Sequence, residues 1–324
     1  MPKSRCHLWH LLAFIGVFIM SWRVVLINQG EYLNLKLDNI IIKKGGLDYS
    51  IPLSDISIIV VEGFDTIITT RLLDALTKYN ISLVTCDNCK TPSGVFAPLN
   101  GHSRVSKLIK EQINWDDELK GLFWKKIIEM KINNQISVLE NLKPKEMEYI
   151  EKLYGYLDDI QLGDTTNREG HAAKIYFNSL FDIDFIREDK TLVINACLNY
   201  GYAIIRAYLA RLTIGYGLVG YLGLFHRNEY NHFNLTDDLI EPFRQFVDCF
   251  VYENYRDKEY LSYEMRQELV DLLNRQVNND GKKTLLCNLM ENYVIKFITA
   301  INKRDQDLMV FPDIKGLLKV EDGL

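Results

Sequence analysis

The sequence predicts an α+β protein with a small N-terminal β-rich domain and a larger all-α C-terminal domain. Up to about residue 87, short runs rich in Val, Ile and Leu alternate with turn residues, a pattern typical of strands. From Ser103 almost to the end, apolar residues recur at helical spacing. At 324 residues, the chain is long enough for two domains that each have a core.

The N-terminal domain, residues 20–87, is expected to be β-sandwich-like with one helix. Its strands are predicted at 22–28, 32–37, 39–43, 56–62 and 81–85. The helix is predicted at 66–79, where Ile68, Leu72 and Leu76 share one face. Residues 88–102 contain two prolines and two glycines and are expected to form the linker.

The C-terminal domain, residues 103–324, is predicted to be helical throughout. Its first segment, 103–142, is either one long helix or a broken pair. A kink or a late helix start is expected at Pro242, since proline disrupts a helix interior. Further helices are predicted at 145–158, 169–181, 191–214, 236–255, 260–277 and 283–303.

The first residues form an apolar run that follows Lys3 and Arg5 and resembles a signal-peptide core. The run, 8–19, is short for a membrane span and is not followed by a small-residue cleavage site. We therefore expect Met20 to be the true start and 1–19 to be a dispensable extension. We expect no membrane partner and a cytoplasmic location, because the six cysteines show no secreted framework.

The net charge of −5 argues against a general nucleic-acid coat protein. It does not exclude a DNA enzyme, because a local basic stripe can lie on an acidic body.

Candidate metal ligands are dispersed through the helical domain at Glu169, His226 and Glu241, with Asp238 as a possible second acidic group. Two carboxylates and one imidazole make a hard, oxygen-rich site that suits Mg²⁺ or Mn²⁺ more than zinc. A metal of this kind acts most naturally on phosphates, so the set indicates phosphodiester chemistry.

The spacing of these residues in the sequence does not by itself decide which of them bind a metal. Glu169 lies near a helix start, where a glutamate also stabilises the helix dipole. His171 and His232 compete with His226 as the imidazole ligand. Asp238 lies in the first turn of a predicted helix, where an acidic residue has the same dipole role.

Four motifs taken together resemble a known family. They are REGxAAxxYF at 168–177, LNYGY at 198–202, GLFH at 223–226 and DLIEPFR at 238–244. In this order and spacing they resemble the CRISPR-associated integrase of spacer acquisition, the Cas-one family. The segment 234–244 resembles the type II branch of that family. The resemblance runs from Met20 to roughly residue 300.

The resemblance implies that Glu169, His226 and Glu241 are the metal ligands and catalytic residues, and it selects His226 over His232. It implies a metal-dependent DNA endonuclease and integrase that inserts short foreign DNA fragments into a CRISPR repeat array. The implied partners are duplex DNA with short overhangs, the repeat array, a second copy bound through the β-rich domain, the small dimeric Cas-two protein and further type II acquisition proteins.

Contact with DNA is expected on the helical domain. The basic candidates are Arg104, Lys107, Lys110, Lys120, Lys125 and Lys126, for which a solvated helix face is the alternative. Tyr200 and Tyr202 are candidates for contact with the DNA end, with packing in an apolar helix as the alternative. The rival functions are a catalytically inactive DNA-binding scaffold and an unrelated metal-dependent phosphohydrolase.

Overall fold

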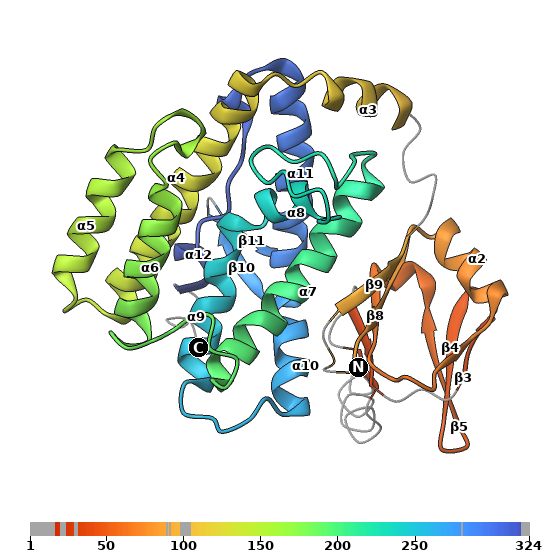
Figure 1. The fold of residues 1–324 in the computed structure, drawn as a ribbon. Helices are drawn as coiled ribbons and strands as arrows, with labels where there is room; N and C mark the ends of the chain where they lie inside the picture. The colour runs from red at the N-terminus through yellow and green to blue at the C-terminus, as the bar shows by residue number, and fades with distance from the viewer. Residues whose placement is uncertain are drawn as a thin grey trace.

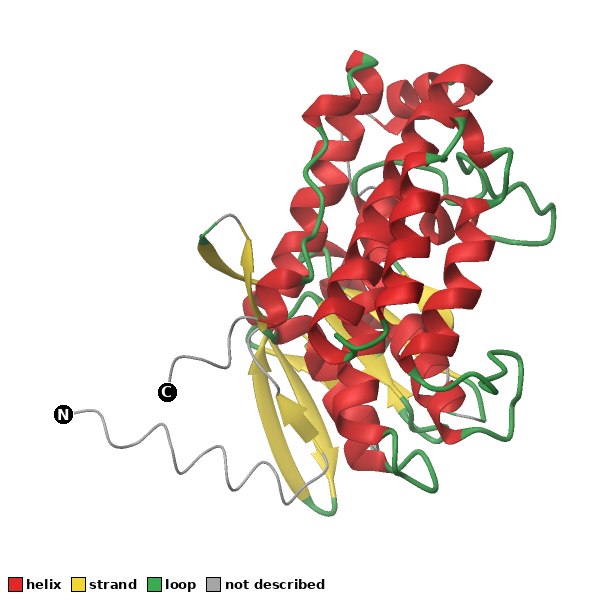
Figure 2. Ribbon diagram, turned by 90° about the vertical axis from the view of Figure 1, so that its left-hand side faces the viewer, coloured by secondary structure: helices red, strands yellow, loops and turns green. Residues whose placement is uncertain are grey.

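The computed structural model describes residues 17–19, 24–28, 32–88, 90, 92–97, 105–279 and 281–318. A strand-rich N-terminal part lies beside a larger helical part (Figure 1), which confirms the predicted fold class. In Figure 2, most of the strands gather in the lower part of the view, and the rest is almost entirely helical.

Two sheets make up the N-terminal part. The first has the order β1-β2-β6-β8-β9 and the second β5-β4-β3-β7. The strands of the first sheet are β1 (Val17–Ile19), β2 (Val24–Ile27), β6 (Ile58–Val61), β8 (Ser82–Cys86) and β9 (Pro92–Phe96). Those of the second are β3 (Tyr32–Lys36), β4 (Asn39–Lys44), β5 (Leu47–Pro52) and β7 (Ile67–Ile68), and the single helix is α2 (Thr70–Lys78).

The first sheet is buried on both faces because its central strands are continuous apolar runs, which is typical of parallel strands. Side chains alternate between two cores along each strand. Val25 and Ile59 face the core shared with the second sheet and α2. Leu26 and Val60 belong to the core of the helical part. This alternation packs the strand-rich part firmly against the helices.

Four strands of this part, β1, β5, β7 and β9, were not predicted, and β7 falls within the predicted helix 66–79. β5 pairs antiparallel with β4, and β9 pairs antiparallel with β8. The expectation of an unstructured linker at 88–102 is wrong for β9. The local sequence of this segment is typical of turns, but the segment forms a strand because it pairs with β8 at the edge of the sheet. A Cβ on Gly94 would lie 2.6 Å from Thr85 Oγ1, so this glycine allows the close pairing.

The predicted extension 1–19 reaches the sheet at its end. Val17–Ile19 form β1, which pairs antiparallel with β2. Residues 1–16 and Met20 lie outside the described residues, so the predicted start site and the dispensability of the extension stay predictions.

The helical part is built around α4, a helix of 26 residues, 13 of which are buried. The predicted helix 103–142 is a broken pair, and Asp116 caps the second helix by accepting from Leu119 N at 2.8 Å. The elements are α3 (Val105–Ile113), α4 (Asp117–Leu142), α5 (Met147–Asp158), η2 (Leu162–Asp164), α6 (Arg168–Leu180), α7 (Val193–Gly215), α8 (Asn234–Leu239), η3 (Glu241–Phe243), α9 (Arg244–Tyr255), α10 (Tyr263–Asp271), η4 (Leu272–Asn274), α11 (Leu286–Lys303), η5 (Gln306–Leu308) and α12 (Lys315–Leu318).

The expectation of an all-α C-terminal domain is wrong at one hairpin. Strands β10 (Gln276–Asn279) and β11 (Lys282–Leu285) pair antiparallel. In the sequence, the two strands are separated by Asp-Gly at 280–281, a strong hairpin signal that the helical periodicity obscured. The break expected at Pro242 is present, since η3 separates α8 from α9. Across the described residues, no helix has the length and apolarity needed to cross a membrane.

Candidate active site

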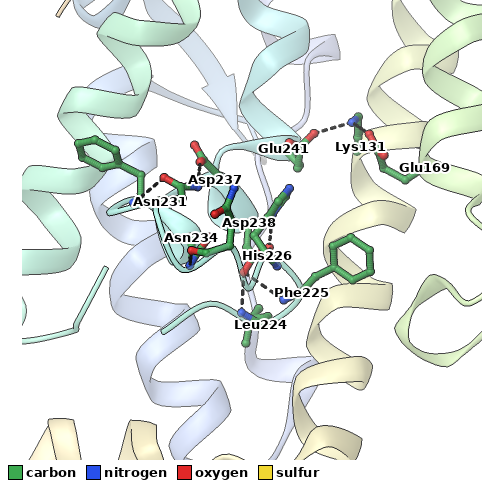
Figure 3. A network of polar contacts seen from close by, with 12 residues as sticks. Lys131, Glu169, Leu224, Phe225, His226, Asn231, Asn234, Asp237, Asp238 and Glu241 are labelled. Carbon is green, nitrogen blue, oxygen red and sulfur yellow. Dashed lines mark hydrogen bonds and ion pairs between the residues drawn. The ribbon is translucent and has the colours of Figure 1, made fainter. Parts of the chain in front are cut away.

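The two predicted carboxylate ligands meet at a buried lysine. Lys131, on α4, has a side chain that is 6% exposed. Its Nζ lies 2.5 Å from Oε2 of Glu241 and also forms an ion pair with Oε1 of Glu169. Figure 3 shows Lys131 between the two glutamates. Three elements distant in sequence, α4, α6 and η3, therefore bring two carboxylates to one cation.

Glu169 is held by the loop that precedes α6. Asp164 is 4% exposed, and its carboxylate accepts from the backbone N of Arg168 at 2.8 Å and of Glu169 at 2.9 Å. The loop turns tightly, since Asp164 and Asn167 both have positive φ, at 50° and 52°. Asp164 was not predicted as the residue that positions Glu169. An acidic residue just before a helix start was the available signal.

Glu241 lies in η3, where Pro242 interrupts the helical run. Its Oε1 accepts from Nε of Arg244 at 2.9 Å. Burial alone would raise the pKa of this carboxyl, but Arg244 and Lys131 outweigh burial and lower the pKa to about 2. Burial likewise favours neutral Lys131, but Glu241 and Glu169 raise its pKa. The site thus holds ionised carboxylates balanced by cations.

His226 is held by Asp238, which is completely buried. Nδ1 of the ring lies 2.7 Å from Oδ1 of Asp238. The same carboxylate accepts the backbone N–H groups of Leu224 at 2.5 Å, Phe225 at 3.2 Å and His226 at 3.1 Å. The hydrogen bond to Asp238 raises the pKa of His226 against the opposing effect of burial. Asp238 therefore acts as the residue that orients His226, and Figure 3 shows the two side chains together.

Tight packing keeps the His226 loop in place. A Cβ on Gly223 would lie 2.5 Å from the carbonyl oxygen of His226 and 2.7 Å from Asp238 Oδ2, so the loop requires glycine here. Phe225 stacks on Trp124 of α4 with ring centroids 4.6 Å apart. The ring of His226 also lies nearly perpendicular to that of Trp124, with ring centroids 5.8 Å apart.

The donor set fits a divalent cation only in part. Among the described residues, no three His, Cys, Asp or Glu side chains lie close enough together to enclose a metal ion. Glu169 and Glu241 already share a cation, the ammonium of Lys131, so these two carboxylates suit a metal. His226 is coupled electrostatically to Glu241, since the charge of Glu241 contributes to the raised pKa of the imidazole.

The two competing histidines each contact a tyrosine ring. His171 is exposed on α6, with its ring 6.0 Å from that of Tyr156. His232 is exposed and meets the ring of Tyr221 edge-on at 5.2 Å.

The basic candidates for DNA contact fall into separate groups. Lys107 and Lys110 on α3 line a cavity of about 730 Å³ together with Arg304. Lys120 lines a second cavity, of about 400 Å³, which also contains His226 and Arg227. Lys107 pairs with Glu111, and Lys125 and Lys126 both pair with Glu129. Arg104 lies outside the described residues.

The expectation of DNA contact is wrong for both tyrosines. Tyr200 is 2% exposed, and its hydroxyl donates to Oε1 of Glu62 at 2.7 Å. Tyr202 is 7% exposed, and its hydroxyl donates to Asp248. Both side chains are buried in the core, which favours the alternative that they serve packing within an apolar helix.

The sequence of this chain matches that of a known protein family. The sequence model described as CRISPR associated protein Cas1 matches residues 24–291. The chain belongs to the Cas1 family. The resemblance inferred from the four motifs is thereby confirmed, while assignment to the type II branch stays a prediction.

One Cas1 relative is the CRISPR-associated endonuclease Cas1 of Neisseria meningitidis serogroup C (strain 8013). It is 35% identical over 305 residues, which cover 92% of this chain and 98% of the relative. Two solved structures share the Cas1 fold. A casposase bound to integration product has a TM-score of 0.72 at 20% identity, over 92% of this chain and 99% of that chain. A chain of a Cas6-RT-Cas1–Cas2 complex has a TM-score of 0.71 at 15% identity, over 92% of this chain and 36% of that longer chain.

Proposed function

We propose that this Cas1-family chain is a divalent-cation-dependent DNA endonuclease and strand-transfer integrase. In this role it inserts short foreign DNA fragments into a CRISPR repeat array. The observation that carries the proposal is the convergence of Glu169 and Glu241 on one buried cation, Lys131. The relative at 35% identity, which is named an endonuclease, supports the same reaction class.

The reaction is the attack of a DNA 3′-hydroxyl on a target phosphodiester, which displaces another 3′-oxygen. Negative charge that builds on the phosphoryl oxygens is stabilised by Lewis-acid chemistry, which is what bound Mg²⁺ or Mn²⁺ supplies. Water in place of the hydroxyl gives cleavage at the same site.

Each residue has a distinct role in this proposal. Glu169 and Glu241 would hold the cation through carboxylate oxygens. Asp238 binds Nδ1 of His226, so Nε2 is the nitrogen left to meet a metal or a phosphate. Arg244 pairs with Glu241 and keeps that carboxylate ionised.

DNA is the proposed substrate. Lys120 and Arg227 share a cavity with His226, which makes this cavity the natural approach for a phosphate backbone. The casposase, described as bound to integration product, supports DNA as the substrate of this fold.

The proposed protein partners are a second copy of the chain, bound through the strand-rich part, and the small Cas-two protein. The latter is supported by the neighbouring structure described as a Cas6-RT-Cas1–Cas2 complex. Further type II acquisition proteins would join if the predicted branch assignment is correct.

The decisive assay compares substrates with and without Mn²⁺. The protein, mixed with its small partner, is given a branched DNA that mimics a joining intermediate, a duplex fragment with a target repeat, and a small phosphodiester. We expect cleavage of branched DNA and fragment joining only with the metal, and no turnover of the small phosphodiester.

The same assay separates the rival functions. DNA binding without any metal-dependent reaction would indicate an inactive scaffold. Turnover of the small phosphodiester that exceeds turnover of DNA would indicate a phosphohydrolase. Either result overturns the proposal.

A further inference from the structure

The charges around Lys131 balance within four side chains. Glu169 and Glu241 carry two negative charges, and Lys131 and Arg244 carry two positive charges. Lys131 is 4% exposed, so its ammonium has little access to water. A buried ammonium depends on its carboxylate partners, because removing one side of such a pair leaves an uncompensated charge.

A divalent cation between the two glutamates would compete with this ammonium for the same oxygens. Adding two positive charges to the balanced set would leave the four side chains and the metal with a net charge of +2. Like charges at such separations repel strongly in a poorly solvated site. The ammonium of Lys131 therefore has to move away when the metal enters.

The backbone around Lys131 is anchored, so the side chain is the part that can move. Asn134, one helical turn further along α4, donates to the carbonyl oxygens of Pro242 at 2.9 Å and of Pro312 at 3.0 Å. Its own side-chain oxygen accepts from Ile314 N at 3.2 Å. These bonds tie α4 to the segment that carries Glu241. The four-carbon stem of lysine has several rotatable bonds, so its ammonium can change position without a shift of the backbone.

We propose that Lys131 is the built-in counter-ion of the metal site: a divalent cation displaces its ammonium, which then binds a DNA phosphate, so that metal and DNA bind cooperatively. This inference rests on the proposed function. A displaced ammonium needs a new anionic partner, and a phosphodiester oxygen supplies one. DNA thus removes part of the cost of the displacement, and by linkage each ligand strengthens the binding of the other.

The test is Mn²⁺ affinity, measured by electron paramagnetic resonance on the full chain with and without a DNA duplex. For the wild-type protein we expect DNA to tighten Mn²⁺ binding. For Lys131→Met we expect Mn²⁺ affinity without DNA to rise by about tenfold or more, because the competing charge is gone. The addition of DNA should then change the Mn²⁺ affinity of Lys131→Met only slightly. Lys152→Met is the matched control, because Lys152 pairs only with exposed Glu148 among the ion pairs of the described residues and should behave as wild type.

Thermal unfolding gives a second readout that does not depend on activity. Without metal, Lys131→Met leaves two carboxylates facing each other and should melt below the wild-type protein. Mn²⁺ should raise its melting temperature more than it raises that of the wild type. If Lys131→Met does not fold in either condition, Lys131→Gln is measured in the same way, since its amide still donates to one glutamate.

Unchanged or weaker Mn²⁺ affinity in the folded variant overturns the role of Lys131, as does equal enhancement by DNA in variant and wild type. If the wild-type protein joins DNA with Mn²⁺ while these outcomes occur, the proposed function stands and only this inference fails. If the wild-type protein binds no Mn²⁺ at all, the proposed metal dependence fails as well.

Discussion

Nδ1 of His226 lies 2.7 Å from Oδ1 of Asp238, and that carboxylate also accepts the backbone N–H of the same histidine. One buried side chain therefore shapes the loop and fixes the ring. The arrangement determines which imidazole nitrogen is available for chemistry. Carboxylate partners of this kind are common behind histidines that bind metals.

Asp238→Asn should reduce DNA joining by about 10- to 100-fold, because the amide cannot orient His226 in the same way. Asp238→Ala should also lower the free energy of unfolding by about 3 kcal/mol, since it leaves buried N–H groups unpaired. Urea titration and a joining assay measure the two effects. Asp237→Asn, at the more exposed neighbour, is the control. A wild-type rate in Asp238→Asn would show that His226 does not need this partner.

Glu169→Ala, His226→Ala and Glu241→Gln should each abolish cleavage and joining while the protein stays folded. The glutamine is chosen at position 241 because this glutamate pairs with both Lys131 and Arg244. His232→Ala should be nearly silent, since its ring contacts Tyr221 at the surface. Metal-dependent activity in any of the three variants would remove that residue from the site. An inactive His232 variant beside an active His226 variant would reverse the histidine assignment.

Glu62 joins the strand-rich part to the helices and should be a major source of stability. It accepts from Tyr200 at 2.7 Å and pairs with Arg266 Nε at 3.1 Å. Glu62→Ala should cost about 3–5 kcal/mol, because Arg266 loses a buried partner. Tyr200→Phe should cost about 1 kcal/mol. The exposed pair of Lys78 with Asp74 is the control, and breaking it should cost below about 1 kcal/mol in the same denaturant titration.

Asp248 should make stability depend on pH. Burial raises the pKa of its carboxyl to about 7, although Tyr202 opposes the shift by donating a hydrogen bond. The folded protein then keeps a proton that the unfolded chain releases near pH 4, so the free energy of unfolding falls as the pH rises through this window. Relative to Asp248→Asn, the wild type should lose up to about 3 kcal/mol between about pH 5 and about pH 8. Parallel pH profiles of the two proteins would contradict this.

DNA binding should weaken steeply with salt, because localised cationic side chains release counterions from the DNA. Neutralising Arg104, Lys107 and Lys110 together should flatten the slope of log affinity against log salt by about two to three. The metal dependence of the remaining reaction should not change. A wild-type salt slope in the triple variant would show that DNA binds to another face of the protein. Lys120, which shares a cavity with His226, is then the first residue to test.

Periodicity alone was sufficient for the fold class and for most helices. Apolar spacing along α7 and α11 is a local property, so the sequence reveals it directly. Strand β9 was missed because its residues are typical of turns, and only the open edge of β8 makes them a strand. Tyr200 and Tyr202 were predicted as DNA contacts because periodicity does not show that their hydroxyl groups donate to buried carboxylates.

For the candidate site, the sequence by itself predicted the ligand types and, through four motifs, determined the family. The tertiary structure decided how these residues are connected. Lys131, which lies 38 residues before Glu169, carries no motif that marks it, yet it forms ion pairs with both glutamates. Asp238 was predicted as a second acidic group, and the fold turns it toward His226 instead. Ion pairs between distant segments depend on how helices pack, so no local pattern in the chain could have predicted them.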